Sequence, residues 1–160
     1  MKHILVTNDD GVLAPGLLAL VQEMQKLGKV AVLAPDRNWS GGGHVKTLDR
    51  ALRVREVRLA DGTQAFASDG APSDCVALGT LGFFKEPIDL VVSGINAGAN
   101  LGHDVTYSGT VTAAMEAIVD ALSTLVTDGT MLKVYAWYDN EMGYACRMVD
   151  LACHLQRRGV

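Results

Sequence analysis

Residues 3–11, His-Ile-Leu-Val-Thr-Asn-Asp-Asp-Gly, decide the fold of this chain. The first five form a continuous apolar run, which is typical of a strand buried on both faces in a parallel sheet. The run stops at residues 8–11, a cluster rich in turn-forming residues. This stretch therefore predicts a buried parallel strand that carries two adjacent carboxylates at its carboxyl end.

Outward from this stretch, strand-type runs alternate with helical patterns along the whole chain. The predicted strands are residues 29–34, the paired runs 52–55 and 64–67, then 88–92 and 131–137. The predicted helices are residues 17–27, ended by Gly28, then 72–79, a stretch from Thr110 onward, and a last helix to about residue 157. Such alternation predicts an α/β fold, three-layer and Rossmann-like, with a mostly parallel sheet and helices on both faces. Without a repeat or a linker, residues 1–160 are expected to form one domain.

Composition excludes several classes of protein. The 160 residues carry 14 Lys and Arg against 18 Asp and Glu, a net charge of −4, which argues against binding nucleic acid. No apolar run approaches the roughly 18 residues that a bilayer span needs, so no membrane association is expected. The sequence has only three cysteines, and an odd number cannot pair completely, so a disulfide framework is not expected. This favours reduced thiols and a cytoplasmic protein.

Three loops at predicted strand ends hold the candidate site, because ligands of open parallel sheets bind at the carboxyl ends of the strands. In the first loop, Asp9 and Asp10 would repel a phosphate but suit a hard cation such as Mg²⁺, Mn²⁺ or Ca²⁺. The alternative is that these residues cap the following helix. In the second and third loops, Ser40 and Asn96 each offer a neutral oxygen to the same ion, or else make only local turn hydrogen bonds.

The third loop ends in Ser108, Gly109 and Thr110, which open a predicted helix. The N–H groups and hydroxyls at such a helix start favour an anion, although ordinary capping by Ser and Thr is the alternative. An anion site that faces a cation held by carboxylates is an arrangement for hydrolysing phosphate esters. The sequence thus predicts a metal-dependent phosphatase, with attack by a metal-bound water or by Asp9 itself.

Five blocks in order resemble the SurE family of stationary-phase survival proteins, which are metal-dependent 5′/3′-nucleotidases. The blocks are VTNDDG (6–11), APDRN with SG (34–38 and 40–41), DGAPSDCV (69–76), SGINAGANLG (93–102), and YSGTV with AAME (107–111 and 113–116). The resemblance implies Asp9, Asp10, Ser40 and Asn96 as metal ligands and Ser108, Gly109 and Thr110 as the phosphate-binding turn. It also implies nucleoside monophosphate substrates, Mg²⁺ or Mn²⁺ as cofactor, and a homodimer or larger oligomer.

From about residue 118 the chain resembles a different family. IVDALSTLV (118–126) and MLKVYAWYDNEMGY (131–144) are similar to the C-terminal segment of glyceraldehyde-3-phosphate dehydrogenases. The chain lacks the glycine-rich dinucleotide fingerprint and the nucleophilic cysteine of those enzymes, so dehydrogenase activity is not expected. The hypothesis is a chimera of residues 1–117 and 118–160, whose tail supplies one more strand and helix.

Two hypotheses for the function follow. The first is a 5′/3′-nucleotidase, with Asp9 and Asp10 as catalytic residues. The second is a non-catalytic chimeric or truncated fold that retains at most metal or phosphate binding. His44 and His103 lie in the site loops, and His103 is either a general acid or, as the preferred interpretation, a surface-loop histidine.

Overall fold

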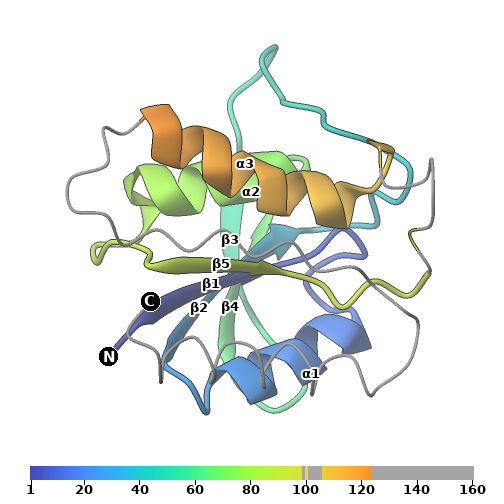
Figure 1. Ribbon diagram of the computed structural model, residues 1–160. Helices are drawn as coiled ribbons and strands as arrows, with labels where there is room; N and C mark the ends of the chain where they lie inside the picture. Colours follow the sequence, from blue (N-terminus) through green and yellow to red (C-terminus); the bar gives the residue numbers. More distant parts are fainter. Residues whose placement is uncertain (99, 101–105, 124–160) are drawn as a thin grey trace.

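The computed structural model describes residues 1–98, 100 and 106–123. A sheet of five strands forms the centre of this part of the chain, in the order β3-β4-β2-β1-β5 (Figure 1). The strands are β1 (His3–Thr7), β2 (Lys29–Pro35), β3 (Val54–Arg58), β4 (Gln64–Ser68) and β5 (Leu90–Ser93). All five residues of β1 are buried, as its apolar sequence predicts for a strand in the middle of a sheet.

The sheet is mostly parallel, which confirms the predicted fold class. β1 pairs in parallel with β2 on one side and with β5 on the other, so that Val6 lies opposite both Val32 and Val92. β4 is parallel to β2, and the edge strand β3 is antiparallel to β4, in agreement with the predicted pairing of those two runs. The loops that follow β1, β2 and β5 therefore leave the same edge of the sheet.

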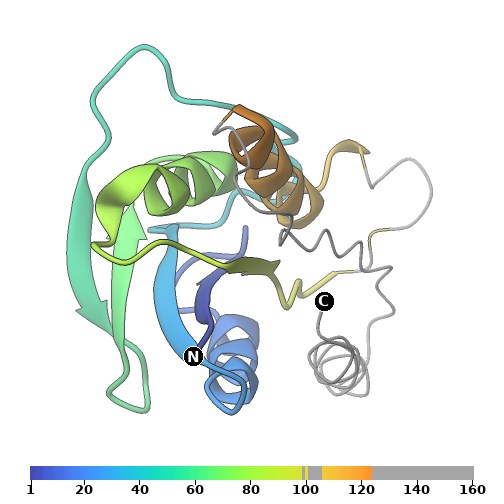
Figure 2. The same ribbon diagram turned by 60° about the vertical axis from the view of Figure 1, so that its left-hand side comes forward.

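Helices cover both faces of the sheet. α1 (Pro15–Met24) lies on one face, whereas α2 (Pro72–Leu78), a π-helical turn η1 (Gly79–Phe83) and α3 (Gly109–Ser123) lie on the other (Figure 1). The turned view shows the three layers from the side (Figure 2). Alternate residues of β1 serve the two interfaces: Ile4 and Val6 join the core beneath α1, and Leu5 packs with Leu33 and Cys75 beneath α2.

Several element boundaries differ from the sequence prediction. α1 ends at Met24, and a tight turn that includes a hydrogen bond from Leu27 N to Met24 O carries the chain to β2. Gly28 is needed there because a Cβ would come within 2.4 Å of the Lys2 carbonyl oxygen. β3 starts at Val54 rather than at residue 52, and the helix from Pro72 continues into η1, where Gly82 has a φ of 110°.

The predicted strand 131–137 and the last predicted helix lie outside the described residues. Within the described part of the chain, no helix combines the length and the hydrophobicity that crossing a membrane requires.

Candidate functional site

The turn after β1 is closed by an asparagine rather than by its two aspartates. Asn8 is fully buried, its Nδ2 donates to the Gly11 carbonyl (3.1 Å) and its Oδ1 accepts from the Gly11 N–H (3.2 Å). The N-cap of α1 is Ala14, and no side chain caps that helix. The alternative role for Asp9 and Asp10, capping the following helix, is therefore wrong, and both carboxylates are directed to other segments.

Asp10 joins the loops that follow β2 and β5. Its Oδ1 accepts a hydrogen bond from Asn38 Nδ2 (3.3 Å) and lies 3.5 Å from the hydroxyl of Ser40. Its Oδ2 accepts from the backbone N–H of Ala97 (2.8 Å). One carboxylate thus connects all three strand-end loops, as the shared edge of a parallel sheet allows.

Asp9 connects the same turn to the start of α3. It is only 2% exposed, and its Oδ1 accepts a short hydrogen bond from the Thr110 hydroxyl. Burial raises the pKa of the Asp9 carboxyl, the neighbouring charge of Asp10 raises it further, and the hydroxyl and backbone of Thr110 partly oppose the rise. The backbone of Gly109 approaches Asp9 so closely that a Cβ on Gly109 would lie 2.6 Å from the Asp9 Cβ.

Ser108 and Asn96 both make the local hydrogen bonds that the alternative interpretation gives them. The Ser108 hydroxyl accepts from the N–H of Val111 (3.2 Å), which is an N-cap bond for α3. Asn96 Nδ2 donates to the Gly98 carbonyl (2.8 Å), next to the Ala97 amide that binds Asp10. These bonds fix the backbone on each side of the two aspartates and leave the roles of Ser108 and Asn96 in ligand binding as proposals.

The donor set at this edge consists of two carboxylates with neutral oxygens around them. Among the described residues, no group of three or more His, Cys, Asp or Glu side chains lies close enough together to hold a metal. Asp9, Asp10 and Ser40 provide oxygen only, which is the chemistry that Mg²⁺ and Mn²⁺ prefer over softer metals.

One buried acidic residue near the site was missed by the sequence analysis. Glu116 on α3 is 1% exposed and forms ion pairs with His44 and Lys46 from the loop after β2. His44 remains exposed, in agreement with a surface position, and its ring also pairs with α3 through Glu116. The charge of Glu116 on the core-facing side of an amphipathic helix was the signal that a cation must pair with it.

The family is decided by a match that runs almost the length of the chain. The family model described as "Survival protein SurE" matches residues 4–154. This chain belongs to the SurE family. The crystal structure of the SurE protein from Aquifex aeolicus superposes with a TM-score of 0.75 and 36% sequence identity, over 99% of this chain and 62% of that one.

Two SurE relatives, both called 5′-nucleotidase SurE, differ in how far they match. The protein from Herpetosiphon aurantiacus is 62% identical over 117 residues, which is 73% of this chain and 46% of the relative. The one from Geotalea daltonii is 47% identical over 157 residues, which is 98% of this chain and 60% of the relative. The chain thus spans about half the length of SurE relatives that it matches.

The comparisons do not support the prediction of a chimera. The family match continues past residue 117 to residue 154, and the Geotalea alignment covers nearly the entire chain. The resemblance of residues 118–160 to a dehydrogenase receives no support from these comparisons. A short block of similar residues, such as residues 131–144, can recur in unrelated chains, whereas a family match extends over whole elements of the fold.

Proposed function

We propose that this chain is a divalent-metal-dependent phosphomonoester hydrolase that acts on nucleoside monophosphates. One observation carries the proposal: the adjacent carboxylates of Asp9 and Asp10 connect both neighbouring strand-end loops to the N-terminus of α3. A cation site and an anion site are thereby brought side by side. The 5′-nucleotidase names of the SurE relatives support a nucleotide as the substrate.

In this proposal, Asp9, Asp10, Ser40 and Asn96 hold one Mg²⁺ or Mn²⁺ ion. The residues fit such an ion because they supply only oxygen ligands. In addition, burial disfavours the ionised form of Asp9 and raises its pKa, and a bound cation would stabilise that ionised form. The ion, when bound, supplies positive charge against the phosphate oxygens. Ser40 and the loop of Asn96 already meet the turn through Asp10.

Ser108, Gly109 and Thr110 form the phosphate side of the proposed site. The first N–H groups of a helix have no partner within the helix, and the helix dipole adds positive potential there. The Ser108 cap bond holds this turn in shape. Thr110 in turn orients Asp9, so that one carboxylate oxygen of Asp9 is directed at the helix start.

The experiment is a phosphatase assay of the purified chain with 5′-AMP and with p-nitrophenyl phosphate, each with Mg²⁺ or Mn²⁺ and with EDTA. Turnover that requires the metal, and that falls by more than roughly 100-fold in Asp9→Asn, supports the proposal. The matched control is Asp61→Asn, which removes the charge of an exposed aspartate that accepts from Gln22, and it should retain full activity.

The alternative hypothesis from the sequence is binding of metal or phosphate without turnover. It predicts that metal and phosphate raise the melting temperature while no phosphate is released. That outcome would exclude the hydrolase and retain the site.

A further inference from the structure

Glu116 is a buried carboxylate whose two oxygens are each paired with a basic side chain from one loop. It is 1% exposed, His44 Nε2 lies 2.7 Å from its Oε2, and Lys46 Nζ pairs with its Oε1. A carboxylate is buried at a large cost unless it is paired, so this cluster fixes the loop to α3 strongly. His44 and Lys46 come from a segment about 70 residues earlier in the sequence, as the separation of 72 between His44 and Glu116 shows.

The backbone of the same loop is fixed at both of its ends. At one end, the Trp39 N–H donates to the Asp9 carbonyl (2.7 Å), and the Ser40 hydroxyl lies 3.5 Å from Asp10. At the other, the Gly43 N–H donates to the Tyr107 carbonyl (3.0 Å), and the Thr112 hydroxyl donates to the Gly43 carbonyl (3.3 Å). We name residues 40–43, Ser-Gly-Gly-Gly, the glycine bridge. They connect the turn that contains Asp10 to Tyr107, the residue before the helix cap Ser108.

The backbone of the glycine bridge is held by its own hydrogen bonds beside the proposed phosphate turn. The N–H groups of Ser40, Gly42 and Gly43 donate to Asn38 Oδ1, the Trp39 carbonyl and the Tyr107 carbonyl. Gly41 has a φ of 78° and Gly43 of 62°, and no atom lies within 4 Å of a Cβ placed on Gly41. Crowding therefore does not require glycine at residue 41, and glycine serves the backbone conformation of the bridge.

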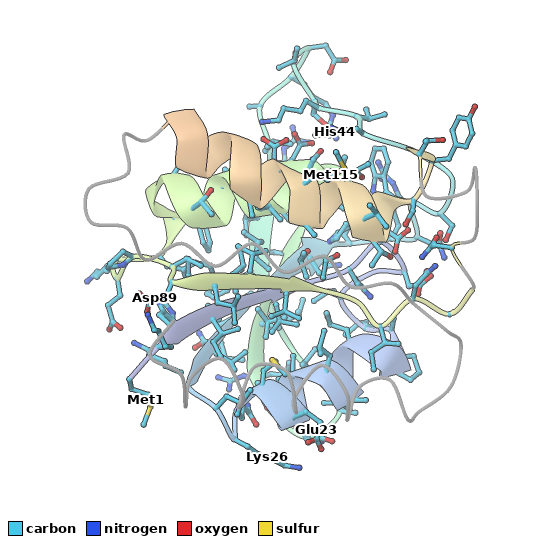
Figure 3. All side chains as sticks on the ribbon, viewed as in Figure 1. Met1, Glu23, Lys26, His44, Asp89 and Met115 are labelled. Carbon is cyan, nitrogen blue, oxygen red and sulfur yellow. The ribbon has the colours of Figure 1, made fainter. Side chains whose placement is uncertain are left out.

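Glu116 itself lies away from the proposed phosphate turn. It follows Thr110 by six residues, which is about 9 Å of helix at 1.5 Å per residue. Figure 3 labels His44 above α3, on the side away from the sheet in that view. The residue before His44, Gly43, is bonded to Tyr107, so the pairing of Glu116 with His44 and Lys46 bears on the helix start through the glycine bridge.

We propose that Glu116 is a positioning residue of the active site. By holding His44 and Lys46, it keeps the glycine bridge docked on the N-terminus of α3, with Ser40 beside Asp10. The inference rests on the proposed function for its catalytic consequence, but the docking of the bridge is a property of the chain alone.

The first test measures the docking without any turnover. In Glu116→Gln, we expect the amide hydrogen of Gly43, which donates to Tyr107, to exchange at least about 10 times faster than in the unmodified chain. The matched control is Glu23→Gln, which breaks an exposed pair with Lys26 on the far side of the sheet (Figure 3). Equal exchange at Gly43 in the two variants would overturn the proposal.

The second test separates positioning from a merely structural role. With 5′-AMP and Mg²⁺, Lys46→Met and Glu116→Gln should each raise KM about 10-fold while kcat changes less than about 3-fold. Lys46→Arg keeps the charge and should restore KM. The double variant that carries both Lys46→Met and Glu116→Gln should show the same KM as Glu116→Gln alone, because both changes release the same bridge. A lower melting temperature with unchanged KM would overturn the proposal.

If the unmodified chain shows no turnover, the proposed function fails and the positioning role is decided by binding. Inorganic phosphate is then the probe, in the presence of Mg²⁺. Its Kd should rise about 10-fold in Glu116→Gln and in His44→Gln and stay unchanged in Glu23→Gln. A Kd that is equal in all of these variants would contradict the positioning role of Glu116, separately from the failure of the hydrolase proposal.

Discussion

Asp9 is the residue at which the cation and anion sides of the proposed site meet. Its backbone carbonyl accepts from Trp39, its side chain accepts from Thr110, and its neighbour Asp10 reaches the two other loops. A carboxylate buried to 2% exposure beside a second carboxylate is unfavourable for the protein alone. The cost is understandable if a cation offsets both charges.

Thr110→Val tests whether the orientation of Asp9 matters for the reaction. The change removes the hydroxyl that donates to Asp9 Oδ1 and keeps the size of the side chain. A hydrogen bond to a charged group contributes about 1.5–3 kcal/mol, so kcat/KM should fall roughly 10- to 100-fold. Thr80→Val, which removes a hydroxyl bonded to the Val76 carbonyl, is the control and should keep kcat/KM. Equal activity of the two variants would show that Thr110 is not needed.

At the residue scale, the sequence could predict charges but not their long-range partners. The pair Asp9 and Asp10 was found because two adjacent acids at a strand end are unusual. The partners of Glu116 could not be found, because the sequence separation of 72 from His44 is closed only by the packing of the loop after β2 across α3. The cap bond of Ser108 was predicted as an alternative, and it is present.

At the element scale, the start of α3 is placed by contact rather than by helix propensity. A Cβ on Gly109 would lie 2.6 Å from the Asp9 Cβ and 2.9 Å from Asp9 Oδ2, closer than real side chains pack. Gly109→Ala should therefore displace either Asp9 or the first turn of the helix. Alanine is the better helix former by up to about 1 kcal/mol, so propensity alone predicts a more stable protein.

We expect the contact to dominate in Gly109→Ala, with a lower melting temperature and kcat/KM reduced more than roughly 10-fold. Ala114→Gly is the reciprocal control in the same helix, because it should cost about 1 kcal/mol of stability without touching Asp9. Its kcat/KM should stay unchanged. Calorimetry and the phosphatase assay measure both effects, and a stabilised, fully active Gly109→Ala protein would show that the helix start does not depend on this contact.

The helices and strands were largely predictable, because their apolar residues follow either the helical period of about 3.6 residues or the patterns of strands. β1, β2 and β5 are short apolar runs, and the parallel pairing of β1 with the other two follows from their alternation with helices. The boundaries were less predictable where tertiary contacts decide them. The end of α1 is one case, since Gly28 is fixed by the Lys2 carbonyl, and the π-helical turn at Gly82 is another.

At the scale of the whole molecule, the Glu116 cluster should give stability a characteristic pH dependence. Its partners Lys46 and His44 hold the pKa of Glu116 below its ordinary value of 4.5, against the opposing effect of burial. A group with a lowered folded pKa stabilises the protein above its unfolded pKa and loses that effect as the pH falls through the folded pKa.

Urea denaturation measures this dependence as the difference in free energy of unfolding between the unmodified chain and Glu116→Gln. At pH 7 we expect Glu116→Gln to be less stable by about 2 kcal/mol, the contribution of hydrogen bonds to a charged group. The difference should shrink as the pH falls below about 4.5. Titrating groups that do not contact Glu116, Asp9 included, are common to both proteins and cancel. A difference that grows as the pH falls below 4.5 would contradict the ion-pair assignment.

Ligand binding should stabilise the whole fold through the same three loops. A ligand that binds only the folded chain adds about 2.7 kcal/mol when its concentration is 100 times its Kd, which for a chain of this size is on the order of 6–10 °C in melting temperature. We expect Mg²⁺ or Mn²⁺ to produce such a rise, inorganic phosphate to add to it only when the metal is present, and EDTA to reverse it. The rise should vanish in Asp10→Asn, because that carboxylate connects the loops after β2 and β5. Asp61→Asn, remote from these loops, should retain it, and a metal response that survives in Asp10→Asn would place the cation elsewhere in the molecule.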